Sequence, residues 1–486
     1  MRNLRSKKSW RRIRPQFVGH HSDGVDLDEH LSFDRVTQSD FLREYFPSGH
    51  KIHDPLHHPD IYRVVEETEV GEDGKERLVK RYYNERVPRY AFAFQQIIAV
   101  KHLAHLCGND VQFDLLNSEG AEHAEVLGKF RDGWSSKDME TCFYELARSV
   151  KITGDGAVVG YVKDGVFSWS SFSFLFGDRL YAHYNHFGGL SVFARAFMSE
   201  EDVDDDCRLV GHIEVWDANR YYLLVESDGA SRVTIGDCYV DGYSVIVEEP
   251  HGFPFIPVVY HRDEAGACWT NSQEAIDMYE ISFSQMAQNN KAFGEPVLYF
   301  KGDDVDCVPD LSGTIKTVTM GKDDDAGYLP AQSASESYHK QLELTYRMIY
   351  EQSFAVIPPE LKSGDLPAAA LKILYSPAYE KALMDCADFQ RAINELVRIF
   401  SFGFGLECEM TTAMMDLPLR CWLKPYVHVN WSSMVSDIVQ CVNSGILSRQ
   451  TGSERLSEYN TPKEWLRIVE ERKELSVERG ELGVEN

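Results

Sequence analysis

The chain has 486 residues, a formal net charge of −27 and ten cysteines, none of them in a CxxC pair. Its length exceeds what one compact core accommodates, so several subdomains are expected. So acidic a chain disfavours simple nucleic-acid binding, which depends on basic patches. The scattered cysteines disfavour a zinc framework and are typical of a protein from a reducing compartment. No apolar run is long enough to cross a bilayer.

The first 28 residues form a basic segment that begins MRNLRSKKSWRRIR. This segment lacks the apolar core of a secretory signal. It is interpreted as a flexible arm, with a specific contact to nucleic acid or to an acidic neighbour as the alternative.

The first half of the chain combines helical and strand patterns. Apolar periodicity predicts a helix over 87–106 and a second helix over 136–150, with Ser136 as its cap. The segment GAVVGYVKDGVFSWSSF has two β-rich runs around a DG turn, which predicts a hairpin. A longer β-rich block runs over 212–249. The first half therefore predicts an α+β domain with a meander-like sheet.

Two long helices with a turn-rich stretch between them are predicted next. The first covers about 271–293, and at ~1.5 Å per residue would span roughly 33 Å. The second covers about 335–354. Residues 294–333 contain short strand-like runs and the acidic text KDDDAG. The pattern therefore predicts a small β-rich tip between two helices.

A loop containing proline, glycine and serine, PPELKSGDLP, precedes the last helical part of the chain. Residues 369–400 favour one long helix, with Pro377 either kinking it or marking a joint. The text PLRCWLKPYVHVNW is strand-like, and 433–480 reads as helical and highly charged.

No sequence motif predicts an enzyme. The sequence contains no GxxxxGK[ST], GxSxG or HExxH motif. It therefore indicates neither a P-loop ATPase nor a hydrolase with a GxSxG or HExxH motif, and no cofactor is predicted. The best metal candidates are His53, His57 and His58 with Asp54 and Asp60, although the nearby prolines favour a polar surface turn. The runs 204–206 and 323–325 are each three aspartates, and a solvated loop is favoured over a cation site for both.

Lys362 and Ser363 lie in the loop before the last long helix. A lysine and a serine beside a glycine can contact phosphate without reading bases. A mobile solvent-exposed loop explains the same residues equally well, and these residues alone do not separate the two interpretations.

Three segments together resemble the tailed-bacteriophage portal proteins. They are FPFIPVVYHRDE followed by NSQEAIDMYEISFSQMAQ, then LKSGDLPAAALKILYSPAYEKA, and finally VNSGILSRQTGSERLSEYNTPKEWLRIVEERKE. They occur in the family's order and cover about the last half of the chain.

The resemblance implies an α+β portal-type subunit with an α/β wing, a two-helix stem, a small β-rich clip, a long helix after a tunnel loop, and a helical crown. The implied divisions are 1–28 basic arm, 29–262 wing, 263–293 first stem helix, 294–333 clip, 334–356 second stem helix, 357–368 tunnel loop, 369–432 long helix with the rest of the wing, and 433–486 crown.

The resemblance also implies a ring of about twelve copies at one capsid vertex of the virion, assembled in the host cytoplasm, through which double-stranded DNA passes in packaging and ejection. Its implied partners are the terminase large subunit, the major capsid and scaffolding proteins and the head-completion or adaptor proteins, with no membrane. The implied DNA-proximal residues are Glu360, Lys362, Ser363, Gly364 and Asp365. The implied docking residues of the clip are Lys301, Asp303, Asp304, Lys322, Asp323 and Asp324.

On this interpretation an anionic channel wall would let the duplex slide, because the negative wall repels the DNA phosphates and does not bind them. Screening would limit the repulsion to roughly 8–10 Å at physiological salt. Two alternatives remain open: another virion structural protein such as an adaptor or baseplate component, and a metal-dependent hydrolase.

Overall fold

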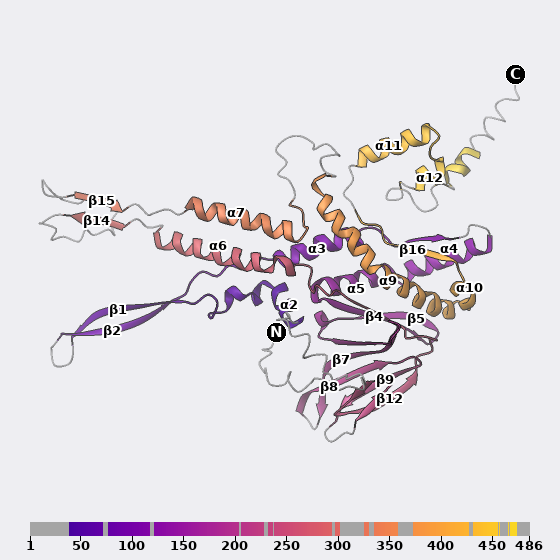
Figure 1. The fold of residues 1–486 in the computed structure, drawn as a ribbon, viewed down its shortest axis with the longest axis horizontal. Helices are drawn as coiled ribbons and strands as arrows, with labels where there is room; N and C mark the ends of the chain where they lie inside the picture. The colour runs from indigo at the N-terminus through magenta and orange to yellow at the C-terminus, as the bar shows by residue number, and fades with distance from the viewer. Residues whose placement is uncertain are drawn as a thin grey trace. The chain divides into compact units, whose positions relative to one another are not determined.

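A computed structural model gives the structure of the chain (Figure 1). It describes residues 38–70, 76–116, 121–203, 206–227, 232–236, 238–293, 297–301, 325–329, 335–357, 373–426, 431–454, 456, 465 and 467–473. The chain divides into two compact units. The first comprises Met1–Ile357 and Glu380–Pro425, and the second comprises Pro358–Tyr379 and Tyr426–Asn486. None of the described helices is long and apolar enough to span a membrane.

The β-rich part of the first unit is a meander, as the sequence predicted. A five-stranded sheet has the order β12-β9-β8-β7-β6, and every neighbouring pair is antiparallel. Its strands are β6 (Arg179–Tyr184), β7 (Leu190–Val203), β8 (Asp206–Trp216), β9 (Arg220–Glu226) and β12 (Tyr243–Pro250). The short strands β10 (Val233–Ile235) and β11 (Cys238–Val240) pair with each other beside it.

A three-stranded sheet, in the order β13-β4-β5, contains the predicted hairpin. Its strands are β4 (Asp155–Lys163), β5 (Val166–Phe172) and β13 (Val258–Arg262). Asp164 and Gly165 make the turn between β4 and β5, with φ of 53° and 77°. Positive φ at both central residues is what a two-residue hairpin turn of type I′ requires, so the hairpin predicted from the DG sequence is confirmed.

The largest hydrophobic core joins this sheet to helices from both halves of the sequence. The helices of the first unit's body are α3 (Phe94–Cys107), α4 (Ala121–Ser136), α5 (Met139–Thr153), α9 (Ser376–Glu407) and the short α10 (Thr411–Met415). Phe130 of α4 and Phe400 of α9 are fully buried with ring centroids 5.0 Å apart. The segment near residue 420, predicted to be strand-like, forms β16 (Leu419–Trp422), which pairs with β3 (Gln112–Leu115).

Both helix starts predicted in the first half were wrong, and the hydrogen bonds at each start show why. α3 begins at Phe94 rather than near 87, because the amides of Tyr90 and Phe92 donate to side chains of α6 instead of to helix carbonyls. Ser136 ends α4 rather than capping α5, and its hydroxyl donates to the Gly133 carbonyl oxygen. The preceding helix α4 was not predicted.

Pro377 marks a joint, which is one of the two outcomes predicted from the sequence: residues 373–374 are helical, Tyr375 is a turn residue, and a new helix follows. α9 begins at Ser376, so the proline lies in the first turn, where its missing N–H costs no hydrogen bond. The helix then runs uninterrupted to Glu407, seven residues past the predicted end.

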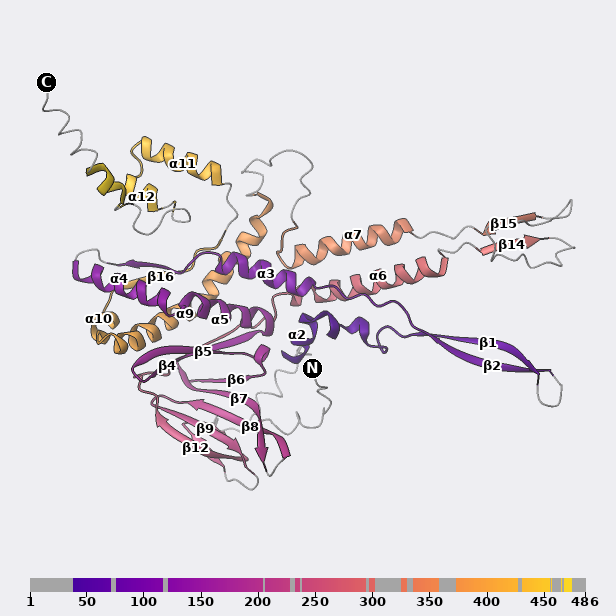
Figure 2. The same cartoon turned by 180° about the vertical axis from the view of Figure 1, so that it is seen from behind.

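The two predicted long helices form as α6 (Gln273–Phe293) and α7 (Ser335–Gln352). Between them in the chain, β14 (Val297–Lys301) pairs antiparallel with β15 (Asp325–Leu329), which confirms β structure in the predicted tip. An unpredicted two-stranded sheet, β1 (Ile61–Val70) with β2 (Glu76–Glu85), forms a separate hairpin. The views from the front and from behind agree that α6 lies between α7 and the start of this hairpin (Figures 1 and 2).

The described part of the second unit is helical. It contains α11 (Trp431–Asn443), α12 (Arg449–Glu454) and a helical segment over 467–473. This confirms the helical pattern predicted for 433–480 in the residues that the structure describes.

Candidate functional site

The helix pair α6–α7 packs through aromatic rings and two polar bridges. Tyr279 of α6 lies 6.2 Å from Tyr346 of α7, measured between ring centroids. The amide of Asn289 donates to the Tyr338 hydroxyl at 3.0 Å, and Gln341 donates to the Ser282 hydroxyl at 3.1 Å. These contacts occupy one face of α6, because Ser282 and Asn289 are seven residues, or nearly two turns, apart.

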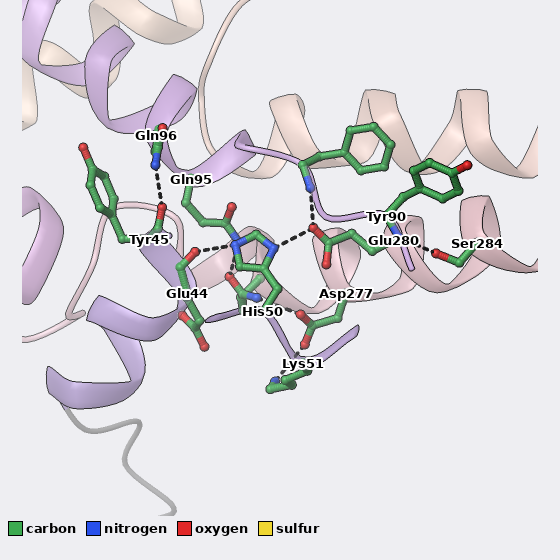
Figure 3. Close-up of polar contacts among 12 residues, drawn as sticks. Glu44, Tyr45, His50, Lys51, Tyr90, Gln95, Gln96, Asp277, Glu280 and Ser284 are labelled. Atoms are coloured by element: carbon green, nitrogen blue, oxygen red, sulfur yellow. Dashed lines mark hydrogen bonds and ion pairs between the residues drawn. The ribbon is translucent and has the colours of Figure 1, made fainter. Parts of the chain in front are cut away.

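A buried histidine fixes the opposite face of α6 (Figure 3). His50 lies just after helix α2 (Gln38–Tyr45), and its Nδ1 is 2.7 Å from Glu280 Oε1. Both side chains are 1% exposed. The same Glu280 oxygen accepts the backbone N–H of Phe92 at 2.8 Å. One carboxylate of α6 therefore holds two segments that are far from it in the sequence. We call His50, Glu280 and the residues bonded to them the root of the helix pair.

The hydrogen bonds of His50 indicate that its ring is protonated. Nε2 is 2.7 Å from the Glu44 carbonyl oxygen, which can only accept, while Nδ1 faces a carboxylate. Two acceptors require both ring nitrogens to carry hydrogen. Burial by itself would lower the pKa of His50, but the hydrogen bond and charge of Glu280 outweigh it and the net shift is upward.

Further polar contacts extend the root along α6. Lys51 donates to Asp277 at 2.7 Å, and Gln273 donates to the other oxygen of the same carboxylate at 2.8 Å. Gln95 of α3 donates to Gln273 at 3.1 Å (Figure 3). Lys51 and Gln95, from two separate segments before residue 100, are thus tied to the first two turns of α6.

Glu44 and Trp269 close the buried end of the root. The indole N–H of Trp269 donates to Glu44 Oε2 at 3.1 Å, and the Trp269 side chain is fully buried. Burial raises the pKa of Glu44, an effect only partly offset by the indole hydrogen bond.

The end of α7 is fixed by α3. His102 lies 2.6 Å from the carbonyl oxygen of Ser353, just past α7, and burial lowers the pKa of His102 to about 4. The neutral ring therefore donates through Nε2. Lys101 donates to the carbonyl oxygen of Val356, and the hydroxyl of Ser272 donates to that of Ile349 at 3.0 Å. Both helices of the pair are consequently anchored at the same end.

A second buried ion pair anchors α9 to α5. Lys151 and Lys381 donate to Asp385 Oδ1 at 2.8 and 2.7 Å, and the side chains of Lys151 and Asp385 are each 2% exposed. Burial would raise the pKa of Asp385, but the charges of the two lysines hold it below its usual value.

These networks anchor the helices of the body to one another. Their acids and bases are bonded to one another inside the body. Among the described residues there is no group of three histidine, cysteine or acidic side chains that could hold a metal ion. Of the metal candidates, Asp60 accepts from Arg89 at 2.8 Å and His58 is buried, while His57 is 3.4 Å from Asp54.

A comparison with protein-family models gives a match over residues 34–479, to the family described as phage portal protein, SPP1 Gp6-like. That range covers most of the chain. The chain belongs to the SPP1 Gp6-like family of phage portal proteins. It is a portal protein of a capsid vertex and a structural component of the virion. Membership implies a subunit of an oligomeric ring.

Two solved structures that are similar to this portal subunit come from gene transfer agent (GTA) particles. One is the neck of an empty particle computed with C6 symmetry, and the other is the virion of a native particle. Each is 12% identical, with 74% of this chain and 87% of the other chain covered and a TM-score of 0.37. Because that TM-score is too low to establish a shared fold, the family model carries the assignment. No curated protein matches the chain.

Most of the predicted site residues of this portal subunit lie outside the described residues. This holds for the five predicted tunnel-loop residues, Glu360, Lys362, Ser363, Gly364 and Asp365. It also holds for Asp303, Asp304, Lys322, Asp323 and Asp324 of the predicted clip. Lys301 is described: it is exposed and ends β14.

Neither the root nor the β1–β2 hairpin was predicted from the sequence. The root has no sequence signature, because His50 and Glu280 are 230 residues apart. The hairpin does have one. The β-branched and aromatic runs IYRVVEETEV and ERLVKRYYNE flank the turn-forming text GEDGK.

Proposed function

We propose that this portal subunit closes into a homo-oligomeric ring, of about twelve copies, that conducts double-stranded DNA during packaging, retention and ejection. The observation that carries the proposal is the helix pair α6–α7. The buried root anchors the pair at the start of α6, and α3 fixes the end of α7. The strands β14 and β15 lie in the sequence between the end of α6 and the start of α7. Such a helix pair is suited to line a channel, because its packing and its anchors are independent of any ligand.

We assign α6 and α7 to the stem, residues 294–333 to the clip and residues 357–368 to the tunnel loop. The α/β body, 29–262 with 369–432, is the wing, and 433–486 is the crown. The exposed Lys301 and the acidic residues after it in the sequence dock the terminase large subunit and then the adaptor. Capsid and scaffolding proteins contact the same ring as it is assembled in the host cytoplasm.

The mechanism we propose is electrostatic and mechanical, without covalent chemistry. The formal net charge of −27 per chain makes a ring that repels the duplex weakly at short range, since screening acts over roughly 8 Å at physiological salt. Lys362 and Ser363 supply brief contacts to the DNA backbone that are independent of sequence. The driving force comes from a separate motor.

Electron micrographs and mass measurement of the purified full-length chain test the ring directly. We expect particles with a central hole. A single protomer under every condition, including inside virions, would contradict the proposal. Deleting 359–367 should leave rings intact and reduce the amount of DNA packaged or retained. If the deletion abolishes rings instead, the loop has a structural role.

A further inference from the structure

The β1–β2 hairpin has an apolar face that its own chain leaves exposed. Residues that alternate along a strand share a face, and so do residues that pair directly across the ladder. Val64 pairs with Tyr82, and Tyr62 and Leu78 lie on the same face of the ribbon. Tyr62, Leu78 and Tyr82 are 71–73% exposed and Val64 is 51% exposed. We call these four residues the hairpin's apolar face.

Within the described part of the chain, β1 and β2 pair only with each other. A two-stranded ribbon without a third strand or a packed face is marginally stable in water. Each strand has ten residues, so the ribbon reaches roughly 33 Å. Exposed apolar side chains on so long a ribbon indicate a surface that another molecule covers.

The start of the hairpin is nevertheless fixed firmly to its own subunit. Arg89 donates to Asp60 Oδ1 at 2.8 Å and to the His58 carbonyl oxygen at 2.7 Å, which clamps the two ends of the hairpin together. Lys291 of α6 lies 3.2 Å from Glu85 at the end of β2. The ribbon therefore leaves the body from a fixed place beside α6.

That place is on the side of α6 opposite to α7. Ser282 and Asn289 contact α7, whereas Ser284 and Lys291 contact the segment 85–90. Each member of the second pair is two positions after a member of the first, which is a rotation of about 200° around the helix. Figures 1 and 2 show the same order, with α6 between α7 and the hairpin.

This arrangement indicates what covers the hairpin. In a ring of identical copies, one side of each subunit meets the opposite side of the next. The hairpin side of one copy then faces the α7 side of its neighbour. α7 has two exposed apolar residues one turn apart, Leu344 and Met348, at 52% and 47% exposure. The chain thus carries both an apolar arm and an apolar surface to receive it.

We propose that the β1–β2 hairpin is an intersubunit arm, whose apolar face lies against the α7 side of the next copy of this chain. The inference rests on the proposed ring. It adds a specific contact to it: burial of Tyr62, Val64, Leu78 and Tyr82 at every subunit boundary. The arm stabilises the closed ring and orders the hairpin in the same step.

Photo-crosslinking of the purified full-length chain tests this contact. A benzophenone amino acid is placed at Tyr82 in one sample and, as the matched control, at Tyr83 on the opposite face of the same strand. In assembled rings we expect covalent species of two or more chains from Tyr82, with the crosslinked peptide in α7, and several-fold less from Tyr83. Crosslinks only within one chain, none at all, or in virions only to a different protein would overturn the proposal.

A substitution pair gives a second, independent readout. Tyr62→Thr with Tyr82→Thr removes two aromatic rings from the apolar face and keeps residues that favour strands. We expect ring assembly to require about tenfold more protein or more. The control, Val79→Thr with Tyr83→Thr, alters the other face and should assemble like the unmodified chain. Equal assembly of both double variants would contradict the inference.

The ring itself is checked first on the unmodified chain by electron microscopy. If rings form and Tyr82 gives no chain-to-chain crosslink, the arm is wrong and the proposed function stands. If no ring forms under any condition, both the intersubunit arm and the proposed function are wrong.

Discussion

The root of the helix pair and the β1–β2 hairpin both contact the helix α6. They differ in whether their side chains find partners within the same chain. At the root, the polar groups of His50 and Glu280 find all their partners inside one chain, at 1% exposure. In the hairpin, Tyr62, Leu78 and Tyr82 are more than two-thirds exposed. Contacts completed within the protomer hold the position of α6, whereas the hairpin keeps its apolar surface for a contact between protomers.

The largest expected effect comes from removing the carboxylate at the root. Glu280→Ala leaves the His50 ring and the Phe92 amide buried without their acceptor. Breaking a buried pair in this way costs roughly 3–5 kcal/mol of unfolding free energy. Urea unfolding measures the loss, and hydrogen exchange of α6 locates it.

Glu274→Ala is the matched control for this substitution. Glu274 is exposed and lies six residues earlier on the same helix. We expect its effect to stay within about 0.5 kcal/mol. If the two variants lose the same stability, the root does not anchor α6.

Two glycines in α4 allow the same comparison between an enclosed and an open position, here for the space available to a side chain. A Cβ at Gly133 would lie 2.3 Å from the ring of Phe404 in α9, whereas a Cβ at Gly128 would meet nothing within 4 Å. Gly133→Ala should therefore cost about 1–3 kcal/mol through overpacking. Gly128→Ala should gain up to about 1 kcal/mol through helix propensity. Thermal unfolding of the two variants checks the sign, and a loss at both positions would contradict the packing described for α4 and α9.

The protonated His50 predicts a pH dependence with a definite sign. Its pKa is raised in the folded protein, so its contribution to stability is full below its ordinary pKa of about 6.5 and is lost as the pH rises through the folded value. Unfolding measured between pH 6 and pH 9 should show this decrease. The variant His50→Gln should have a flatter profile over the same range, and an unchanged slope would assign the titration to another group.

The smallest effect is expected in the hairpin of the isolated protomer. Leu78 is 71% exposed, so Leu78→Thr should change the protomer's unfolding free energy by no more than about 0.5 kcal/mol. In assembled rings the same strands should exchange their amide hydrogens several-fold more slowly than in protomers. Equal exchange in both states would show that the hairpin gains no cover on assembly.

Local patterns predicted the elements whose cause is local. The DG turn between β4 and β5, the meander of the large sheet and the helices α6 and α7 were predicted from neighbouring residues, and the structure confirms them. The errors arose where distant groups compete for the backbone. α3 starts late because the amides of Tyr90 and Phe92 are bound by α6 rather than by their own turn. The tunnel-loop and most of the clip predictions concern residues outside the described part and stay predictions.

The sequence by itself determined that this is an α+β chain with two long helices around a short β segment, and it carries the resemblance to portal proteins. Hydrophobic periodicity and turn chemistry act over a few residues, so they can be read directly. Only the tertiary structure decided which side of α6 carries α7, which side carries the hairpin, and which buried charges hold that arrangement. Such pairs form between residues 230 or more positions apart, because the low polarity of the interior requires each buried charge to find a partner wherever the fold supplies one.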